Sequence, residues 1–437
     1  MKKAIALMLC CLLFAAILAG CNSGSQASSA ASESGSSSAA EGSSSSEESA
    51  APSGEKLKME FFQQQGEESI QAGYIEMCKG FNEANPEYEI EMNTVPEAPA
   101  TLTSRFAAND IPPIFNDYPT QLQFHEKVEN GFILDLTGQE FLNNVDESAI
   151  EMCRQPDGKD YALPYLRNFM GVYYNIDLFE QYDVEIPTTY KDFIAACETF
   201  KSNGVTPLQF AFKDNVNHFF QATNIAFMPD GVDKLVDAAA NGTKIEGDAE
   251  YKAYAERLLE IVSYGSEDAF AVPNTTATEQ FANGSSAMFL AGSYIRGNLA
   301  LANPDFNFGV FPLPNDTVET TTTIAGINAS HCISASATPE EQEAGLKFLA
   351  YLADPKNAQN WSNISGEIST IKGVTFSDDR LAPQLDFINT GKVHDWMGSS
   401  LNNNIVTGLY NVTQAFLLDQ DVDKYLKDID STIATNR

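Results

Sequence analysis

A strand, a helix and a second strand follow one another over residues 57–93, and this order constrains the fold more than any other feature. Residues 57–62 form a short apolar run. Apolar residues then recur at helical spacing over 70–81, and Asn85-Pro86 ends the pattern. Alternation of apolar residues with glutamates over 88–92 is typical of a half-buried strand. We therefore predict an open α/β sheet at the start of the folded part.

Further helices and strands are expected along the chain, and its length indicates two lobes. Helices are predicted from Thr189, over 251–261 and from Thr338, where Ser/Thr caps or apolar periodicity mark them. Short strands are predicted at 171–174, 287–290 and 308–311. About 380 residues follow Glu55, which suits two lobes of ~190 residues better than one domain.

The start of the chain has the layout of an export signal. Lys2 and Lys3 precede an apolar run over 4–19, which is too short for a comfortable transmembrane helix. Leu18-Ala19-Gly20-Cys21 resembles the bacterial lipobox, which implies cleavage after residue 20 and lipidation of Cys21. Residues 22–54 are almost wholly Ser, Ala, Gly and Glu, and we expect a disordered tether spanning about 30 Å.

Charge and cysteine usage limit the partners and the chemistry. The formal net charge of −34 argues against binding nucleic acid and against an electrostatic hold on anionic lipid. Cys78, Cys153, Cys197 and Cys332 lack CxxC spacing. Cys78 and Cys197 fall on apolar helix faces, which favours buried free thiols, although two disulfides stay open in an exported protein.

Three passages together resemble the extracellular solute-binding subunits of bacterial ABC importers, in particular the sugar-binding group that includes the maltose-binding proteins. The first runs from Leu163-Pro164-Tyr165 through Asn175 to residues 186–193. The second is Phe281 to Phe289, ending at Gly292-Ser293-Tyr294, and the third is 308–314. They occur in the family's order and span most of the mature chain.

The resemblance implies two α/β lobes of the periplasmic-binding-protein fold, joined by three crossing segments, with a ligand cleft that closes by a hinge. The crossings are expected near 165–168, 311–314 and 369–372. The amino-terminal lobe would comprise 56–166 plus 314–370, and the carboxy-terminal lobe 167–313 plus 371–437.

A neutral sugar needs planar side chains for stacking and amides or carboxylates for its hydroxyls. Gln64, Gln65 and Glu67 follow the first strand, where the strand ends of an open sheet face a cleft. Tyr294 stands where the family often carries a stacking tryptophan. The other candidates, chosen by side-chain chemistry or by resemblance, are Asn116, Asp117, Asn168, Asn217, His218, Ser293, Arg296, Gly326, Asn328, Trp361 and Trp396.

For several candidates a purely structural role is an open alternative to ligand binding. Asp117 would serve equally in a turn, His218 as a packed histidine, and Arg296 as the partner of a carboxylate. Trp396 lies in a loop-like stretch and is expected to be more exposed than Trp361, which helix-end core packing would also explain.

Enzymatic motifs are weak. HExxH, GxSxG and Walker patterns are missing, and Ser369-Thr370-Ile371-Lys372 matches the SxxK of penicillin-binding enzymes without its companions. We expect no metal and no cofactor. The reading is a monomeric receptor, lipid-anchored outside the cytoplasmic membrane of a Gram-positive cell, that hands an oligosaccharide to an ABC permease without catalysing a reaction. The alternatives are a receptor for a polyamine or peptide, a tethered glycoside hydrolase, and an adhesin or scaffold.

Overall fold

The computed structural model describes residues 56–376 and 378–437. The predictions for Cys21 and for the tether therefore lie outside the described residues. None of the helices in the described part is long and apolar enough to cross a membrane.

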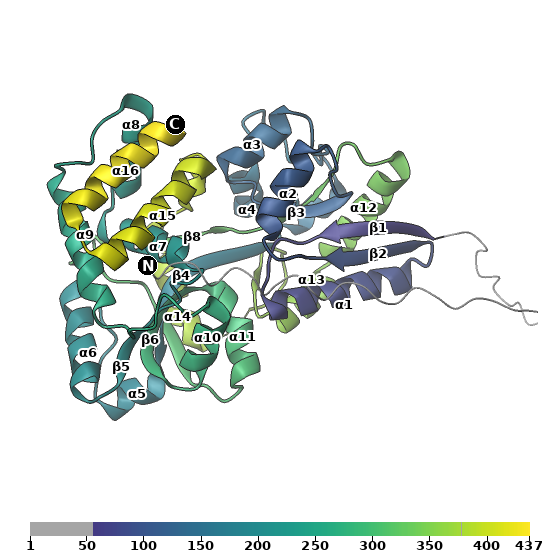
Figure 1. The fold of residues 1–437 in the computed structure, drawn as a ribbon. Helices are drawn as coiled ribbons and strands as arrows, with labels where there is room; N and C mark the ends of the chain where they lie inside the picture. The colour runs from purple at the N-terminus through teal and green to yellow at the C-terminus, as the bar shows by residue number, and fades with distance from the viewer. Residues whose placement is uncertain (1–55, 377) are drawn as a thin grey trace, which may run out of the picture. The chain divides into compact units, whose positions relative to one another are not determined.

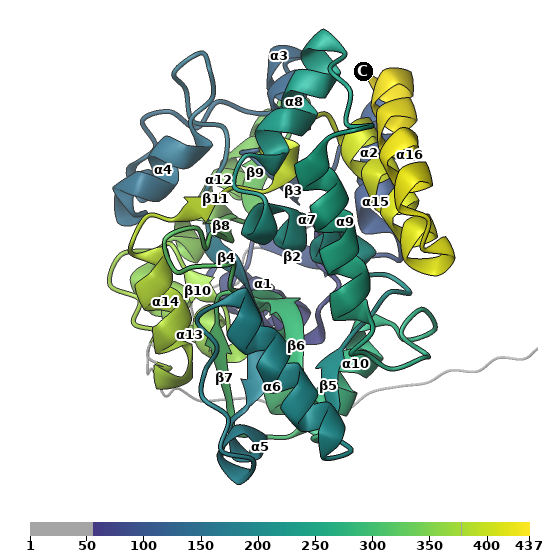
Figure 2. The ribbon, with the colours of Figure 1, turned by 90° about the vertical axis from the view of Figure 1, so that its left-hand side faces the viewer.

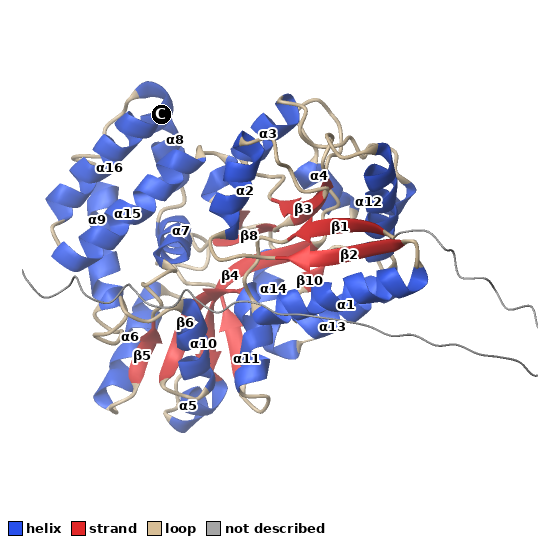
Figure 3. Ribbon diagram, turned by 45° about the vertical axis from the view of Figure 1, so that its right-hand side comes forward, coloured by secondary structure: helices blue, strands red, loops and turns tan. Residues whose placement is uncertain are grey.

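A four-stranded sheet organises the first core, with the strand order β2-β1-β3-β9. Figure 3 shows β1, β2 and β3 of this sheet. β1 pairs in parallel with both β2 and β3, and β9 runs antiparallel to β3. The predicted strand, helix and strand of residues 57–93 are confirmed as β1, α1 and β2. The elements of this part are β1 (Leu57–Phe62), α1 (Glu68–Ala84), β2 (Tyr88–Asn93), α2 (Ala98–Ala107), β3 (Ile114–Asp117), α3 (Leu122–Glu129), η1 (Glu140–Asn144), α4 (Glu147–Cys153), β9 (Ser330–Ile333), α12 (Pro339–Leu352) and α13 (Pro355–Ser365).

A seven-stranded sheet organises the second core around β4, which has neighbours on both sides along its ten residues. The elements along this part of the chain are β4 (Leu166–Asn175), α5 (Ile176–Gln181), α6 (Tyr190–Ser202), β5 (Thr206–Gln209), α7 (Val216–Phe227), α8 (Gly231–Asn241), α9 (Ala249–Val262), α10 (Asn274–Ala282), β6 (Ser286–Gly292), η2 (Ser293–Ile295), α11 (Arg296–Ala302), β7 (Phe308–Phe311), β8 (Thr323–Ile327), β10 (Ile368–Ser369), η3 (Asp379–Leu381), α14 (Ala382–Ile388), β11 (Val393–His394), η4 (Met397–Ser399), α15 (Asn403–Asp419) and α16 (Val422–Asn436). Figure 2 shows α8, α9, α15 and α16 gathered on one side of this part.

Of three clusters of buried apolar residues in the described part of the chain, the two larger ones define the two lobes. The amino-terminal core contains residues from Met59 to Leu166 and again from Ile327 to Ile371. The carboxy-terminal core contains residues from Phe169 to Ile324 and again from Leu381 to Ile433. Each lobe is thus built from two separate stretches of chain, and the chain passes between the cores three times.

The three passages between the cores lie side by side on β4. The first half of β4 pairs with β8 and β10, and its second half pairs with β6 and β7 (Figure 2). The second passage differs from the expectation. Leu313 and Ile324 both pack in the carboxy-terminal core, whereas Ile327 packs in the other. The chain therefore changes lobe within β8 and not at 311–314, because the segment before β8 stays bound to its own lobe.

Helix starts follow the capping signals in the sequence. Thr189 accepts a hydrogen bond from the Asp192 N–H, and Thr338 with Glu341 forms a complete capping box at the start of α12. Cys78, Cys153, Cys197 and Cys332 are buried free thiols.

Thr338→Ala is expected to lower the free energy of unfolding by about 1 kcal/mol, because it leaves the Glu341 N–H in the first turn of α12 without its side-chain acceptor. Urea unfolding followed by circular dichroism measures this. Thr199→Ala, which removes an exposed hydroxyl inside α6, is the control and should change stability little. Equal losses in both variants would contradict the capping role.

β9 places His331 in an aromatic group of the amino-terminal core. Its side chain is fully buried, and Nε2 lies 3.1 Å from the hydroxyl oxygen of Tyr74. The rings of Phe61, Tyr74 and Tyr165 surround it at centroid distances of 4.9–5.4 Å. Burial lowers the pKa of His331 to about 3, so the ring stays neutral in the folded protein at physiological pH.

His331 should make the fold less stable as the pH falls. The unfolded chain binds a proton at this histidine below about pH 6.5, whereas the folded chain does not. Stability is therefore complete above that pH and is lost below it, by up to about 1.4 kcal/mol per pH unit. His331→Phe should show a flatter pH dependence of urea unfolding between pH 6.5 and 5. Repacking around the phenylalanine can change the free energy of unfolding by the same amount at every pH, which leaves its slope against pH unaffected. Equal slopes in the wild type and His331→Phe would contradict the prediction.

Candidate functional site

A cleft of about 500 Å³ lies between the two lobes. One wall comes from the loop after β1 and from α2 and α3, and the other from α7, η2 and the region of η4 and α15. Figure 1 shows α2 and α3 in one lobe and α7 and α15 in the other. Its size is in the range of small-molecule sites.

The amino-terminal wall of the cleft is polar, and hydrogen bonds to Asn116 of β3 hold it in place. Asn116, fully buried at the end of β3, accepts a hydrogen bond from the Gln64 N–H at 2.8 Å. The Gln64 side chain donates to the Asn116 carbonyl at 2.5 Å. Asn116 also bonds the Gln63 side chain. These contacts fix the turn that presents Gln64, Gln65 and Glu67 to the cleft.

Asp117 occupies the same wall but is already paired. Its carboxylate is 1% exposed and forms an ion pair with Lys127 of α3. The second oxygen accepts from the Tyr118 N–H at 2.9 Å. The charge of Asp117 is therefore compensated within the protein. The neighbouring Tyr118 adds an aromatic ring to this wall.

Three rings form the carboxy-terminal wall. The His218 ring lies 5.2 Å from the Tyr294 ring and 5.4 Å from the Trp396 ring, measured between centroids. Asn215 bonds both His218 and the Tyr294 hydroxyl and fixes their orientation. Gly292 allows this arrangement, since a Cβ there would lie 2.2 Å from the Tyr294 ring.

Trp396 is joined to the first passage between the lobes. Its indole N–H donates to Asn168 of β4 at 3.1 Å. The following residue is held by Gln221 of α7, which accepts from the Met397 N–H at 2.9 Å and donates to Tyr410 at 2.8 Å. The position of the tryptophan ring is thus fixed from two elements.

The electrostatics of the cleft favour a neutral or cationic ligand. Burial raises the pKa of Glu67 and, near the other end of the cleft, the pKa of Asp395. Burial lowers the pKa of His218 to about 4, so its ring is neutral at physiological pH. Lys127 is engaged by Asp117. Among the described residues, no group of His, Cys, Asp and Glu is arranged to hold a metal ion.

Ten of the fifteen predicted residues line the cleft. They come from seven separate stretches of chain: Gln64, Gln65, Glu67, Asp117, Asn168, Asn217, His218, Tyr294, Asn328 and Trp396. Trp396 is half-buried and Trp361 fully buried, in the order expected from the sequence.

Five predicted residues do not line the cleft, and each has a structural reason. Trp361 packs in the amino-terminal core against Tyr74 and Tyr165, at centroid distances of 5.3 and 4.8 Å. Asn116 is buried beneath the wall and hydrogen-bonds Gln64, as described above. Gly326 is covered by Asp395, whose carboxylate oxygen would lie 2.7 Å from a Cβ at that position.

Ser293 and Arg296 lie beyond the cleft at a contact between the lobes. Both side chains are buried, and Arg296 pairs with Asp378 at 3.2 Å, which is the alternative left open by the sequence. The SxxK match also has structural partners. The Ser369 hydroxyl donates to the Tyr165 carbonyl and the Lys372 ammonium to the Asn143 carbonyl.

Sequence reasoning missed much of the wall formed by α2, α3 and α15. Pro99, in the first turn of α2, was the one local signal of a helix start next to the cleft. The others carry no local signal, because only the fold brings them here. The missed residues are Gly66, Glu97, Pro99, Ala100, Leu102, Thr103, Tyr118, Thr120, Gln121, Gln123, Lys127, Gln221, Ile327, Gly398, Asn403, Val406 and Tyr410.

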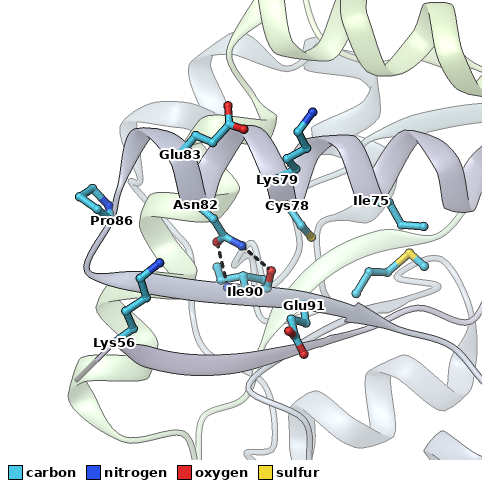
Figure 4. Close-up of a pocket in the computed structure, with 10 residues that line it drawn as sticks. Lys56, Ile75, Cys78, Lys79, Asn82, Glu83, Pro86, Ile90 and Glu91 are labelled. Atoms are coloured by element: carbon cyan, nitrogen blue, oxygen red, sulfur yellow. Dashed lines mark hydrogen bonds between the residues drawn. The ribbon is translucent and has the colours of Figure 1, made fainter.

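A second hollow, of about 680 Å³, lies on the outside of α1 and β2 (Figure 4). Asn82 spans it with two backbone hydrogen bonds to Ile90, both at 2.9 Å, and Ile75 is 55% exposed. It contains none of the predicted site residues and only one lobe contributes to it. The interlobe cleft is therefore the better candidate for a ligand site, because polar and aromatic groups from both lobes converge there.

Comparison with known proteins assigns the family. The model of the bacterial extracellular solute-binding protein family matches residues 76–383. A multiple sugar-binding protein of Streptococcus mutans is 24% identical over 356 residues, covering 80% of this chain and 84% of the relative. An uncharacterised ABC transporter extracellular-binding protein of Pyrococcus horikoshii is 23% identical, covering 72% of each chain.

Solved structures agree on the fold. RafE in complex with raffinose has a TM-score of 0.78 and 22% identity, covering 87% of this chain and 99% of that one. A sugar transporter of Bacillus licheniformis in complex with stachyose has a TM-score of 0.73 and 19% identity, covering 87% and 100%. The predicted two-lobed periplasmic-binding-protein fold is confirmed. With more than half of its length matched by the family model, the chain belongs to the bacterial extracellular solute-binding proteins.

Proposed function

We propose that this protein is the carbohydrate-binding receptor of an ABC importer and that its cleft captures a neutral oligosaccharide. The observation that carries the proposal is the opposition of two walls. The rings of Tyr294, His218 and Trp396 face a wall of amides and carboxylates that includes Gln64 and Glu67. Rings suit the weakly apolar faces of sugars, and the opposite groups suit hydroxyls.

The relatives support the same class of ligand. The S. mutans relative is named for binding multiple sugars, and the solved structures hold raffinose and stachyose. A strongly anionic solute is disfavoured, because Lys127, the basic residue that lines the cleft, is already paired with Asp117.

Residues of both walls are proposed to contact the sugar. Trp396 and Tyr294 stack on sugar rings, with His218 packed between them. The hydroxyls are bound by the polar residues Gln64, Gln65, Glu67, Asn168, Asn217 and Asn328. Asp117 and Asn116 position this wall through the contacts described above.

Closure about the three passages on β4 captures the solute. We propose residues 56–166 as the first segment of the amino-terminal lobe and place its second segment from β8 to residue 370. The remaining segments form the carboxy-terminal lobe. β4 starts in the amino-terminal core at Leu166 and enters the carboxy-terminal core at Phe169, so it is the axis about which the lobes rotate.

The receptor is proposed to work at the outer face of the cytoplasmic membrane, anchored through a lipid on Cys21 in a Gram-positive cell. It delivers the sugar to a membrane permease, acts as a monomer, and needs neither metal nor cofactor. It leaves its sugar chemically unchanged.

A thermal-shift screen tests the proposal. The purified protein is heated with raffinose, stachyose, maltose, xylo-oligosaccharides, spermidine and a mixed peptide pool. A ligand at one hundred times its Kd adds about 2.7 kcal/mol to native stability, which raises the unfolding midpoint. A shift with one sugar class, with the sugar recovered intact, supports the receptor. A shift with spermidine or peptide alone overturns the carbohydrate assignment, and sugar hydrolysis overturns the absence of catalysis.

A further inference from the structure

The two lobes touch directly beside the cleft, where α11 of one lobe meets α1 and the end of α13 of the other. Gly297 makes this approach possible, because a Cβ there would lie 2.1 Å from Ser69 Oγ and 2.6 Å from the Ser365 carbonyl. Arg296 donates a hydrogen bond across the contact to the Gly366 carbonyl at 2.6 Å. The contact is therefore as tight as a protein interior.

Glu367 is buried within this contact. It lies between α13 and β10, next to the third passage between the lobes, and its side chain is 0% exposed. Neither carboxylate oxygen accepts a hydrogen bond from a described residue. An ionised carboxylate without partners in such a place is strongly disfavoured, because it loses its hydration.

The groups facing Glu367 do not compensate its charge. Arg296 attracts it, but two nitrogens of the guanidinium bind Gly366 and Asp378, and the buried Nε–H, which has no partner, forms no hydrogen bond with Glu367. Glu67, on the loop before α1, repels it. The Ser293 hydroxyl lies close without hydrogen-bond geometry.

The remaining titratable neighbours are neutral. Tyr74 on α1 and Tyr173 on β4 both interact with Glu367, and burial raises the pKa of each phenol. Tyr294 on η2 is likewise held neutral by burial, which raises its pKa. His331 on β9, bonded to Tyr74, is neutral as described. Glu367 is thus left without a full counter-charge, and burial raises its pKa to about 8.

We propose that Glu367 is a proton-dependent latch between the lobes: the neutral carboxyl permits the α1–α11 contact, and the ionised carboxylate opens it. The inference rests on the proposed function, because closure of the lobes is what captures the solute. It adds a coupling between capture and pH that the binding residues themselves do not provide.

The direction of the coupling follows from proton binding. In the open form the carboxyl meets water and regains an ordinary pKa near 4.3, whereas the closed form keeps it protonated up to about pH 8. The closed form is therefore fully favoured below the lower pKa, and it loses population as the pH rises. Between the two values the ratio of closed to open protein falls up to tenfold per pH unit.

Small-angle X-ray scattering of the purified protein without any sugar tests the latch. The radius of gyration of the wild type should increase between pH 6 and pH 9, whereas Glu367→Gln should keep its low-pH value throughout. Glu68→Gln, an exposed acid in the first turn of α1, is the matched control and should behave as the wild type. A wild-type radius of gyration that does not change with pH overturns the proposal. So does a Glu367→Gln radius of gyration that changes with pH as the wild type does.

Infrared spectroscopy of the wild type supplies a measurement that needs no variant to fold. At pH 7 the spectrum should contain the C=O band of a protonated carboxylic acid, which disappears with a midpoint below the closed-form pKa of about 8, because opening stabilises the ionised carboxylate. A spectrum without this band at pH 7 overturns the latch. Both measurements omit sugar, so a failure of the carbohydrate screen leaves them interpretable, and a failure of the latch leaves the carbohydrate receptor standing.

Discussion

Trp396→Ala is expected to weaken binding of the captured sugar about 30- to 100-fold while the protein stays folded. The ring is half-buried in the cleft, and its N–H bonds Asn168. Its loss removes a stacking surface and leaves the Asn168 amide oxygen without this donor. Removing such an aromatic anchor costs about 2–3 kcal/mol of binding free energy. Isothermal titration calorimetry with the sugar identified by the screen measures the change.

Two control variants separate stacking from hydrogen bonding. Trp396→Phe keeps a planar ring and loses the indole N–H, so it should retain most of the affinity. Leu418→Ala removes a 63% exposed side chain on α15 and should bind as the wild type. Unchanged affinity in Trp396→Ala would remove this ring from the proposed site.

Trp361→Ala should have the opposite effect, with a large loss of stability and little change in affinity of the folded protein. The indole is fully buried against Tyr74 and Tyr165, and Gly73 makes room for it, since a Cβ there would lie 2.8 Å from the ring. Emptying such a site typically costs about 3–5 kcal/mol of unfolding free energy. Urea unfolding followed by circular dichroism measures the loss.

Trp361→Phe is the matched variant, because it leaves a smaller cavity and should lose less stability. A fully stable Trp361→Ala protein that fails to bind sugar would return this residue to the binding site. Taken together, the two tryptophans should separate the two kinds of effect, one on binding and one on folding.

Local patterns in the sequence were sufficient for the elements and for part of the cleft. The alternation over β2 and the capping box at Thr338 depend on neighbours in the chain, and both are present in the structure. Gln64 and Tyr294 follow strand ends, so their place in the cleft also has a local cause.

The positions of the other candidate residues depend on tertiary packing. Trp361 and Trp396 have the same chemistry, and only the aromatic group around His331 explains why one is buried. Arg296 was expected to reach a ligand, but Asp378, distant in the chain, already binds it. Tyr410 reaches the cleft because α15 packs on α7, and nothing in its own surroundings in the chain indicates this.

The discontinuity of the amino-terminal lobe also bears on how the chain folds after it leaves the cell interior. Phe61 and Tyr74 lie near the start of the folded part, yet they pack against His331 and Trp361, more than 250 positions later. A chain that crosses a membrane with its amino terminus first therefore holds an unfinished core outside for most of the transit. The apolar faces of β1 and α1 would be exposed during this transit, so we expect extracytoplasmic chaperones and proteases to act on the chain before its core is complete.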